Sequence, residues 1–302
     1  MPATAIEHVL AMSLVLIAIV SSAVAMAHVS YYGVSLAVEG TAANAYALQQ
    51  AIFMDLSDDC GLNCIDVDRL DEFSTTYEMA EPSLFKTYGA LLSELNLEDV
   101  EFHLWATSGL NVSATWVNST VSINVFQPFS QRGISAALTV YVFDGIRVLE
   151  TLTGETNVQG TAVIQPTADG AVFIFASRGT SVGFTFLPRI GIVNAAEATG
   201  VYVRGGQILP QAHRPSSYFI LSKDGYTGPL SSGAVAVSAY GLPVAIVWKE
   251  SSLVRVLTYP HFPIDYGAPV SSTAFTLTTV ATVEGSIVTV KLQVWGSGGE
   301  FH

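Results

Sequence analysis

Residues Val9–Ala27 read VLAMSLVLIAIVSSAVAMA, and this stretch decides the predicted fold. Every residue in it is apolar except three serines, and residues 8–38 contain no Asp, Glu, Lys or Arg. As an α-helix the stretch would extend roughly 28 Å, which is close to the thickness of a bilayer core. A helix that is apolar on every side must be buried, either in lipid or among other protein chains.

The helix is predicted to begin near Thr4 and to continue to about residue 57. Thr4 and Glu7 have the spacing of a capping box, and Pro2 cannot extend a helix backward. Beyond Ala27 the apolar residues keep a helical period, but only on one side, as far as Phe53. This pattern is typical of a helix with one end inside an assembly and the other end against its own domain. The apolar side chains predicted to form the core of that assembly are Val9, Leu10, Leu14, Val15, Leu16, Ile17, Ile19, Val20 and Val24.

Glu7 is the acidic residue next to this apolar stretch, and two roles fit it. It can complete the capping box with Thr4, or it can pair with the N-terminal amine of an adjacent subunit. An unpaired buried carboxylate would cost several kcal/mol, so one of these partners is expected.

The rest of the chain has the pattern of short strands. Residues 58–99 are predicted to form a connector with one short helix, over 82–95. From Val100 onward, apolar and polar residues alternate between turn signals such as Asp144-Gly145 and Glu284-Gly285. In the last of these strands the inward side chains should be Val288, Val290, Leu292 and Val294.

The predicted fold class is therefore α+β: a long N-terminal hydrophobic helix followed by a β-rich head. The head should contain one or two antiparallel, immunoglobulin-like β-sandwiches, since turn signals recur every 8–12 residues or so. The predicted regions are a helix over 1–57, a connector over 58–99, a first sandwich over 100–188 and a second over 189–302.

The composition restricts the partners of the protein. Charged residues make up 12% of the 302-residue chain, and the formal net charge is −13. An acidic chain does not favour nucleic acid or anionic lipid headgroups as partners. A surface of Ser, Thr, Gly, Asn and Gln suits an extracytoplasmic protein, covered by neighbouring subunits or by sugar.

The only two cysteines are Cys60 and Cys64. No further cysteine or nearby histidine completes the four ligands of a zinc site. A small-loop disulfide and two free thiols both fit the spacing, and a disulfide would indicate an oxidising compartment. Two N-glycosylation sequons, at Asn111 and Asn118, point to the same location.

Signals for catalysis or metal binding are weak, and we predict no enzyme, no cofactor and no metal. The run Gly179–Gly183 spells G-x-S-x-G around Ser181, but strands are predicted on both sides of it. A hairpin turn therefore fits better than a hydrolase nucleophile. The six histidines lack metal-ligand spacing. The acidic residues around 58–72 could hold calcium, but they lack the Gly and Glu of an EF-hand loop, so a solvated linker is favoured.

An apolar N-terminal helix with one acid near its start and a β-rich head after it resembles a type IV pilin. The all-β head is similar to the archaeal branch of that family, the archaellins and adhesion pilins. The resemblance implies that a prepilin-type peptidase removes a basic leader, so that the mature chain starts at or near Met1. It also implies transient residence in the membrane, an assembly machinery, and a helical homopolymer of many copies. Glu7 stands two positions later than the acid of bacterial pilins.

The sequence therefore predicts a structural subunit of an extracellular, cell-surface filament that serves adhesion. The main alternative is a membrane-anchored extracytoplasmic protein whose β-sandwiches bind a ligand. A secreted hydrolase that uses Ser181 is the third hypothesis.

Overall fold

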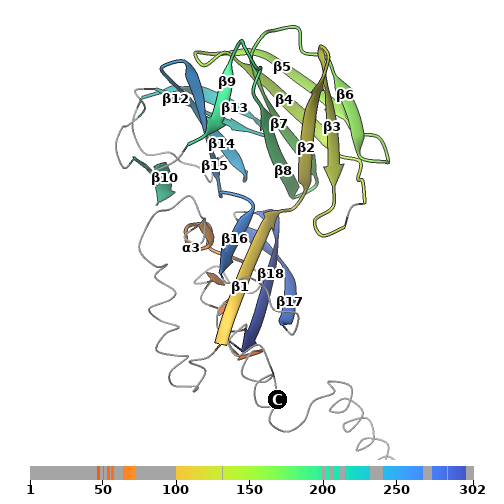
Figure 1. Ribbon diagram of the computed structural model, residues 1–302, viewed down its shortest axis with the longest axis vertical. Helices are drawn as coiled ribbons and strands as arrows, with labels where there is room; N and C mark the ends of the chain where they lie inside the picture. The colour runs from red at the N-terminus through yellow and green to blue at the C-terminus, as the bar shows by residue number, and fades with distance from the viewer. Residues whose placement is uncertain are drawn as a thin grey trace, which may run out of the picture.

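The described part of this protein is built mainly from β-strands. In the computed structural model, the described residues are 64–71, 100–130, 132–198, 201–204, 207–210, 215, 217–231, 241–267, 274–283 and 285–296, together with seven helical positions between 46 and 57. The one helix with described bounds is α3 (Val67–Asp71), which lies beside the stem (Figure 1).

The strands form four sheets. The largest has eight strands. Seven of them follow the order β16-β1-β18-β8-β7-β4-β5, and the eighth, β17, pairs with β18 outside this order. Its strands are β1 (Val100–Ser108), β4 (Ala137–Phe143), β5 (Val148–Glu155), β7 (Ala171–Arg178), β8 (Ser181–Leu187), β16 (Ile264–Gly267), β17 (Phe275–Val283) and β18 (Ser286–Gly296).

A five-stranded sheet has the order β13-β12-β14-β15-β9, and a three-stranded sheet has the order β2-β3-β6. The five strands are β9 (Asn194–Glu197), β12 (Tyr218–Ser222), β13 (Gly225–Leu230), β14 (Val244–Glu250) and β15 (Leu253–Tyr259). The three are β2 (Asn111–Val117), β3 (Thr120–Phe126) and β6 (Thr161–Ile164), and a separate hairpin joins β10 (Val201–Arg204) to β11 (Gln207–Pro210).

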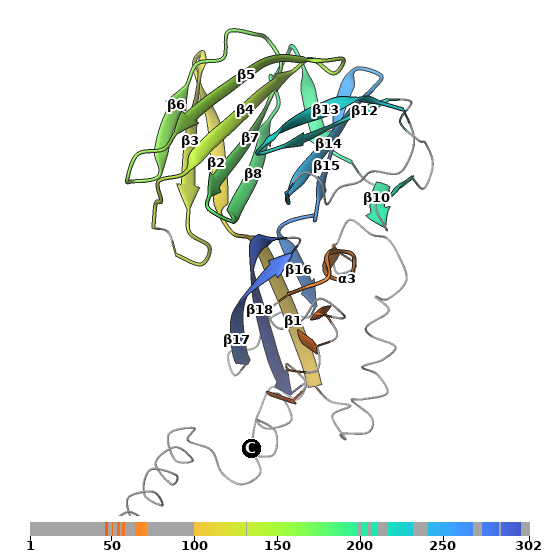
Figure 2. The same cartoon turned by 180° about the vertical axis from the view of Figure 1, so that it is seen from behind.

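A single residue pair, Ile287 with Ser181, joins the two halves of the eight-stranded sheet. One half, β16-β1-β18-β17, together with α3, is here called the stem. The other half, β8-β7-β4-β5, together with the three- and five-stranded sheets, is called the head. Figures 1 and 2 show the stem as a narrow layer below the broad head.

The middle sheet of the head is buried on both faces. In β7, Val172 and Ile174 face the three-stranded sheet, whereas Phe173 and Phe175 face the five-stranded sheet. This arrangement explains why β7 is apolar at successive positions instead of alternating. The five-stranded sheet is also buried on both faces, because Phe219 meets the middle sheet while Ile220 joins the core of the stem.

Both ends of the described chain lie in the stem. Leu56, Ile65 and Leu70 pack into the same core as Leu104 of β1 and Leu292 of β18. Near α3, the backbone N–H of Ile65 donates to the carbonyl of Thr282, 2.9 Å away, and the Tyr259 hydroxyl donates to Asp68 Oδ1 at 2.5 Å. The chain thus rises through β1, builds the head, and returns through β16, β17 and β18.

Head and stem share an apolar core, and further side-chain contacts join them. Phe129, in the loop between β3 and β4, packs on Trp105 of β1 with ring centroids 4.2 Å apart. Ser286 at the start of β18 donates a buried hydrogen bond of 2.6 Å to the carbonyl of Leu242 in the head. The head is therefore docked on the stem through side chains as well as through its two connecting chains.

The predicted fold class, α+β with one or two antiparallel sandwiches, is wrong. Strand predominates in the described residues, none of which belong to a helix of seven residues or more, and the sheets are open and stacked in more than two layers. The sheets are also mixed, since β9 runs parallel to β15 and β18 runs parallel to β8. The alternation rule could not anticipate this, because sheets covered on both faces lose the alternation that identifies a two-layer sandwich.

The other sequence predictions have different outcomes. The predicted helix over residues 4–57 and the short helix over 82–95 lie largely outside the described residues. Val288, Val290, Leu292 and Val294 are buried, as predicted. The proposed boundary at residues 188 and 189 falls between β8 and β9 and stays a prediction.

Candidate functional site

Several of the predicted site residues lie outside the described part of the chain. They are Glu7, Cys60 and the nine apolar residues of the expected assembly core, which are Val9, Leu10, Leu14, Val15, Leu16, Ile17, Ile19, Val20 and Val24. Cys64 is described and is disulfide-bonded. The chain contains one other cysteine, Cys60.

The two sequons occupy opposite ends of β2. Asn111 is the first residue of this strand and lies next to the stem, where its Oδ1 accepts a hydrogen bond of 3.1 Å from the Thr107 hydroxyl. Asn118 follows the last residue of β2, in the turn to β3 at the end of the head away from the stem (Figures 1 and 2). At the rise of an extended strand, the two asparagines are roughly 20 Å apart.

Three exposed apolar side chains at the end of the head away from the stem are here called the distal tip: Val117, Ile190 and Ile192. Their exposed fractions are 51%, 86% and 54%. Val117 ends β2, and the two isoleucines lie in the loop between β8 and β9. Ile190 and Ile192 therefore offer apolar surface from one loop for contact.

The loop of the distal tip is fixed against the end of β2. The Trp116 indole N–H donates to the carbonyl of Pro188 at 3.0 Å, and the Arg189 guanidinium lies 4.1 Å from the centre of the Trp116 ring. Arg189 also lies 3.8 Å from Asp169. The loop closes on itself through two hydrogen bonds of 2.9 Å between Arg189 and Val193. The tip is thus presented by a tethered loop, which reduces the entropy lost on contact.

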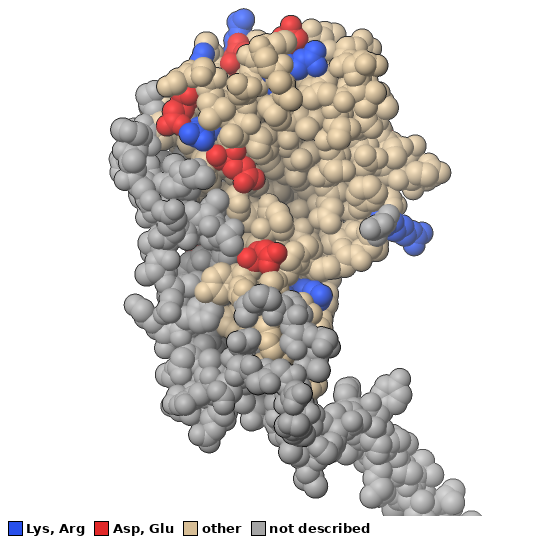
Figure 3. Space-filling view, viewed as in Figure 1, with Lys and Arg blue, Asp and Glu red and all other residues tan. Residues whose placement is uncertain are grey.

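The outer face of the three-stranded sheet is free of charge. Its inner face carries Val121, Ile123 and Val125, which belong to the core of the head. The alternate positions therefore point outward, and the strand register places them in rows across the sheet. These outward residues are Ser113, Thr115, Val117, Thr120, Ser122, Asn124, Thr161 and Val163. Figure 3 shows this side of the head as a broad area with few charged atoms.

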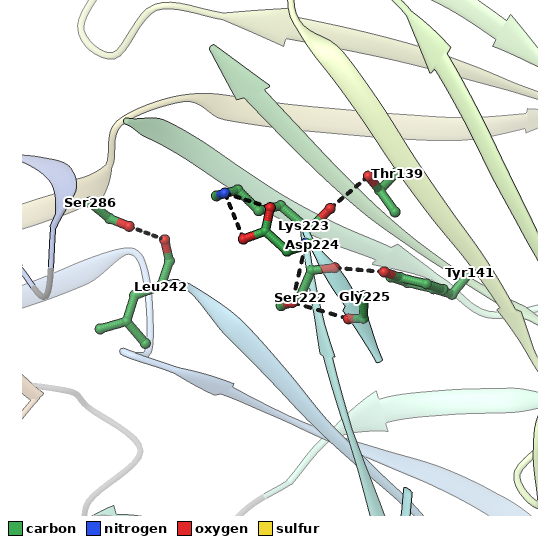
Figure 4. A network of polar contacts seen from close by, with 8 residues as sticks. All are labelled: Thr139, Tyr141, Ser222, Lys223, Asp224, Gly225, Leu242 and Ser286. Atoms are coloured by element: carbon green, nitrogen blue, oxygen red, sulfur yellow. Dashed lines mark hydrogen bonds and ion pairs between the residues drawn. The ribbon is translucent and has the colours of Figure 1, made fainter. Parts of the chain in front are cut away.

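A polar cluster joins the middle sheet to the five-stranded sheet (Figure 4). The Tyr141 hydroxyl donates to the carbonyl of Ser222 at 2.8 Å, and the Thr139 hydroxyl donates to the carbonyl of Lys223 at 2.8 Å. Burial, with a smaller contribution from the negative charge of Asp224, raises the pKa of Tyr141 to about 12. The hydroxyl therefore stays protonated and donates its hydrogen bond at physiological pH. This cluster ties two sheets together and does not present a nucleophile.

The remaining polar candidates have structural surroundings. Ser181 pairs with Arg178 across the two-residue turn of the β7–β8 hairpin, so the predicted hairpin turn is confirmed. Asp66 Oδ1 accepts the backbone N–H of Arg69 at 3.0 Å and caps α3. His261 is buried, and burial lowers the pKa of its imidazole, although Glu197 opposes this effect.

The described residues form neither a metal-binding cluster nor a helix that could cross a membrane. No group of three or more His, Cys, Asp or Glu side chains in this part of the chain could hold a metal ion. Of the helices that the described residues form, none has the length and apolar character needed to cross a membrane.

The distal tip was not predicted from the sequence. The one signal in the sequence was Arg189-Ile-Gly-Ile192, because a segment between two strands runs over the surface and exposes side chains. Its packing against Trp116 had no such signal, because the two segments are 72 positions apart in the chain.

Comparisons of the chain with known protein families, with curated proteins and with solved structures found no match.

Proposed function

We propose that this protein is a structural subunit of an extracellular, pilus-like filament and that it displays its head for adhesion. The observation that carries the proposal is the course of the chain. Residues on the N-terminal side of β1 pack into the stem, while the distal tip and the charge-free sheet lie in the head beyond it. A subunit held from its N-terminal side would present the head outward.

The sequence supports burial of the N-terminal segment in an assembly. The large apolar side chains of Val9–Ala27 would gain on the order of 20 kcal/mol on burial, which is far too much to leave in water. Head-to-tail contacts between identical subunits that do not close into a ring produce an open helical polymer.

The surface of the head supports both lateral packing and adhesion. Contact through Ser, Thr and Asn side chains requires no removal of water from charged groups, so the outer face of the three-stranded sheet suits a neighbouring subunit. The distal tip offers Ile190 and Ile192 for contact with an external surface. A membrane-anchored surface protein is the second candidate, since Val9–Ala27 is also long enough for a bilayer.

The test replaces Leu16 by Asp, which would place a carboxylate in the buried segment. We expect Leu16→Asp to abolish filaments in material sheared from cells, as seen by negative-stain electron microscopy with mass spectrometry of the chain. Ile146→Asp is the matched control, because Ile146 is exposed in the head and its replacement should leave the filaments intact. Recovery of the unaltered chain from detergent-extracted membranes alone would refute the filament and favour the anchored protein.

A further inference from the structure

We propose that Asn118 carries an N-linked saccharide and that Asn111 does not. Both lie in Asn-X-Ser/Thr sequons, seven residues apart, and the sequence alone does not show which of the two is modified. The structure distinguishes them, because Asn118 lies at the distal end of the head and Asn111 lies at the junction with the stem.

Asn118 has the surroundings that an attached sugar needs. It is exposed and occupies the first position of a two-residue turn, with a φ of 57°, a left-handed conformation that asparagine tolerates better than most residues. Val117 and Thr120 pair across this turn, and the Thr120 hydroxyl donates to the carbonyl of Val117 at 2.9 Å. The hairpin therefore keeps Asn118 at its end, where an added sugar displaces no neighbouring residue.

Asn111 has the opposite surroundings. Its Oδ1 is bonded to the Thr107 hydroxyl, and Thr107, Ser108 and Leu110 beside it are buried. The backbone next to Asn111 is tightly packed, since a Cβ added at Gly183 would come within 2.2 Å of the carbonyl oxygen of Leu110. A saccharide on Nδ2 of Asn111, whose Oδ1 is held by Thr107, would have to fit at the junction of head and stem.

The modification needs an activated sugar, which we assign to the class of lipid-phosphate-linked saccharides. A bond forms between Nδ2 of Asn118 and the anomeric carbon of the sugar, while the bond from that carbon to the phosphate oxygen breaks. The lipid phosphate leaves with the bonding electrons, and the amide nitrogen loses one proton. No oxidation or reduction takes place.

The attached saccharide would change the character of the distal tip. Asn118 directly follows Val117, and Trp116 holds the loop that carries Ile190 and Ile192. A hydrated saccharide would thus stand next to the exposed side chain of Val117, at the same end of the head as that loop. The inference rests on the extracytoplasmic location in the proposed function, but it does not depend on filament formation.

The experiment measures glycopeptides and intact mass of the full chain isolated from its native host, with variants at the third sequon position and one variant at Asn118. Thr120→Ser keeps both the sequon and the hydroxyl that bonds Val117, so the added mass should remain. Thr120→Ala destroys the sequon, and the added mass should disappear. Asn118→Gly serves as the second loss variant, since glycine accepts the left-handed turn without strain.

Ser113→Ala destroys only the Asn111 sequon, and we expect this variant to keep the full added mass. Occupancy of Asn111, or unmodified Asn118 in the unaltered protein, would overturn the inference. Each result can be distinguished from failure of the proposed function: unglycosylated filaments would refute only the inference, and glycosylated Asn118 without filaments would refute only the polymer.

Discussion

Tyr141 shows how one buried hydroxyl links two sheets and makes stability depend on pH. Its pKa is raised from 10.0 to about 12, so the folded state holds the proton more tightly than the unfolded chain. The stabilising contribution is complete below about pH 10 and is lost as the pH rises through about 12. We expect the free energy of unfolding to decline over this interval, measured by urea denaturation at several pH values.

Replacing Tyr141 by Phe tests this role. The variant leaves the buried carbonyl of Ser222 without its hydrogen bond, so the free energy of unfolding at pH 7 should fall by about 1–2 kcal/mol. Because the titrating group is gone, the decline between pH 10 and 12 should be smaller than in the unaltered protein. An identical alkaline decline in both proteins would contradict the assigned pKa shift.

Gly133 illustrates a position where no side chain fits. A Cβ there would come within 1.8 Å of the carbonyl oxygen of Gln159, so the loop after β3 and the turn before β6 would have to separate. Gly133→Ala should lower the free energy of unfolding by about 3 kcal/mol. The control is Gly179→Ala, where the added Cβ has no neighbour within 4 Å and only the positive φ of 60° costs about 1 kcal/mol. Equal losses in thermal unfolding would show that the close approach is absent.

At the residue scale, the sequence identifies local chemistry but not long-range neighbours. The turn at Ser181 could be predicted, since it depends only on adjacent strands and glycines. The difference between Asn111 and Asn118 could not, because it depends on Thr107 and on the position of β2 between stem and head. The same limit applies to the pairing of Trp116 with Arg189.

At the scale of elements, β7 is the strand on which the head depends most. It contacts both neighbouring sheets, and Phe173 and Ile174 are fully buried on opposite faces. Phe173→Ala should lower the free energy of unfolding by about 3–5 kcal/mol, and Ile174→Ala by about 2–5 kcal/mol.

The control for β7 is Val163→Ala in β6, where the side chain is exposed and the loss should stay within about 0.5 kcal/mol. Chemical denaturation of the three variants provides the comparison. If truncation on only one face of β7 destabilised the protein, the middle sheet would not be covered on both faces.

The sequence predicts individual strands better than their arrangement. The predicted turn at Asp144-Gly145 connects β4 to β5, and β17 and β18 pair at Val283 and Ser286, on either side of the other predicted turn. The alternation of apolar and polar residues also predicted which side chains of β18 point inward, because the outer face of the stem is polar. The stacking of layers was not predictable, since the apolar runs of β7 and β12 show burial on both faces without showing which sheets cover them.

At the scale of the whole molecule, the head is inserted between β1 and β16. The first and last strands of the described chain, β1 and β18, pair along nine residues of the stem, so the stem closes only after the head has been built. This arrangement places the turn between β2 and β3 at the end of the head away from the stem (Figures 1 and 2). It is the geometry that a subunit held at one end requires for display at the other.

Polymerisation and display can be examined together by cryo-electron microscopy of filaments sheared from cells. The account predicts a helical reconstruction in which Val9–Ala27 lies in the filament core and the turn at Asn118 lies at the outer radius. Filaments with the head at the centre, or the chain present only in membranes without filaments, would contradict it.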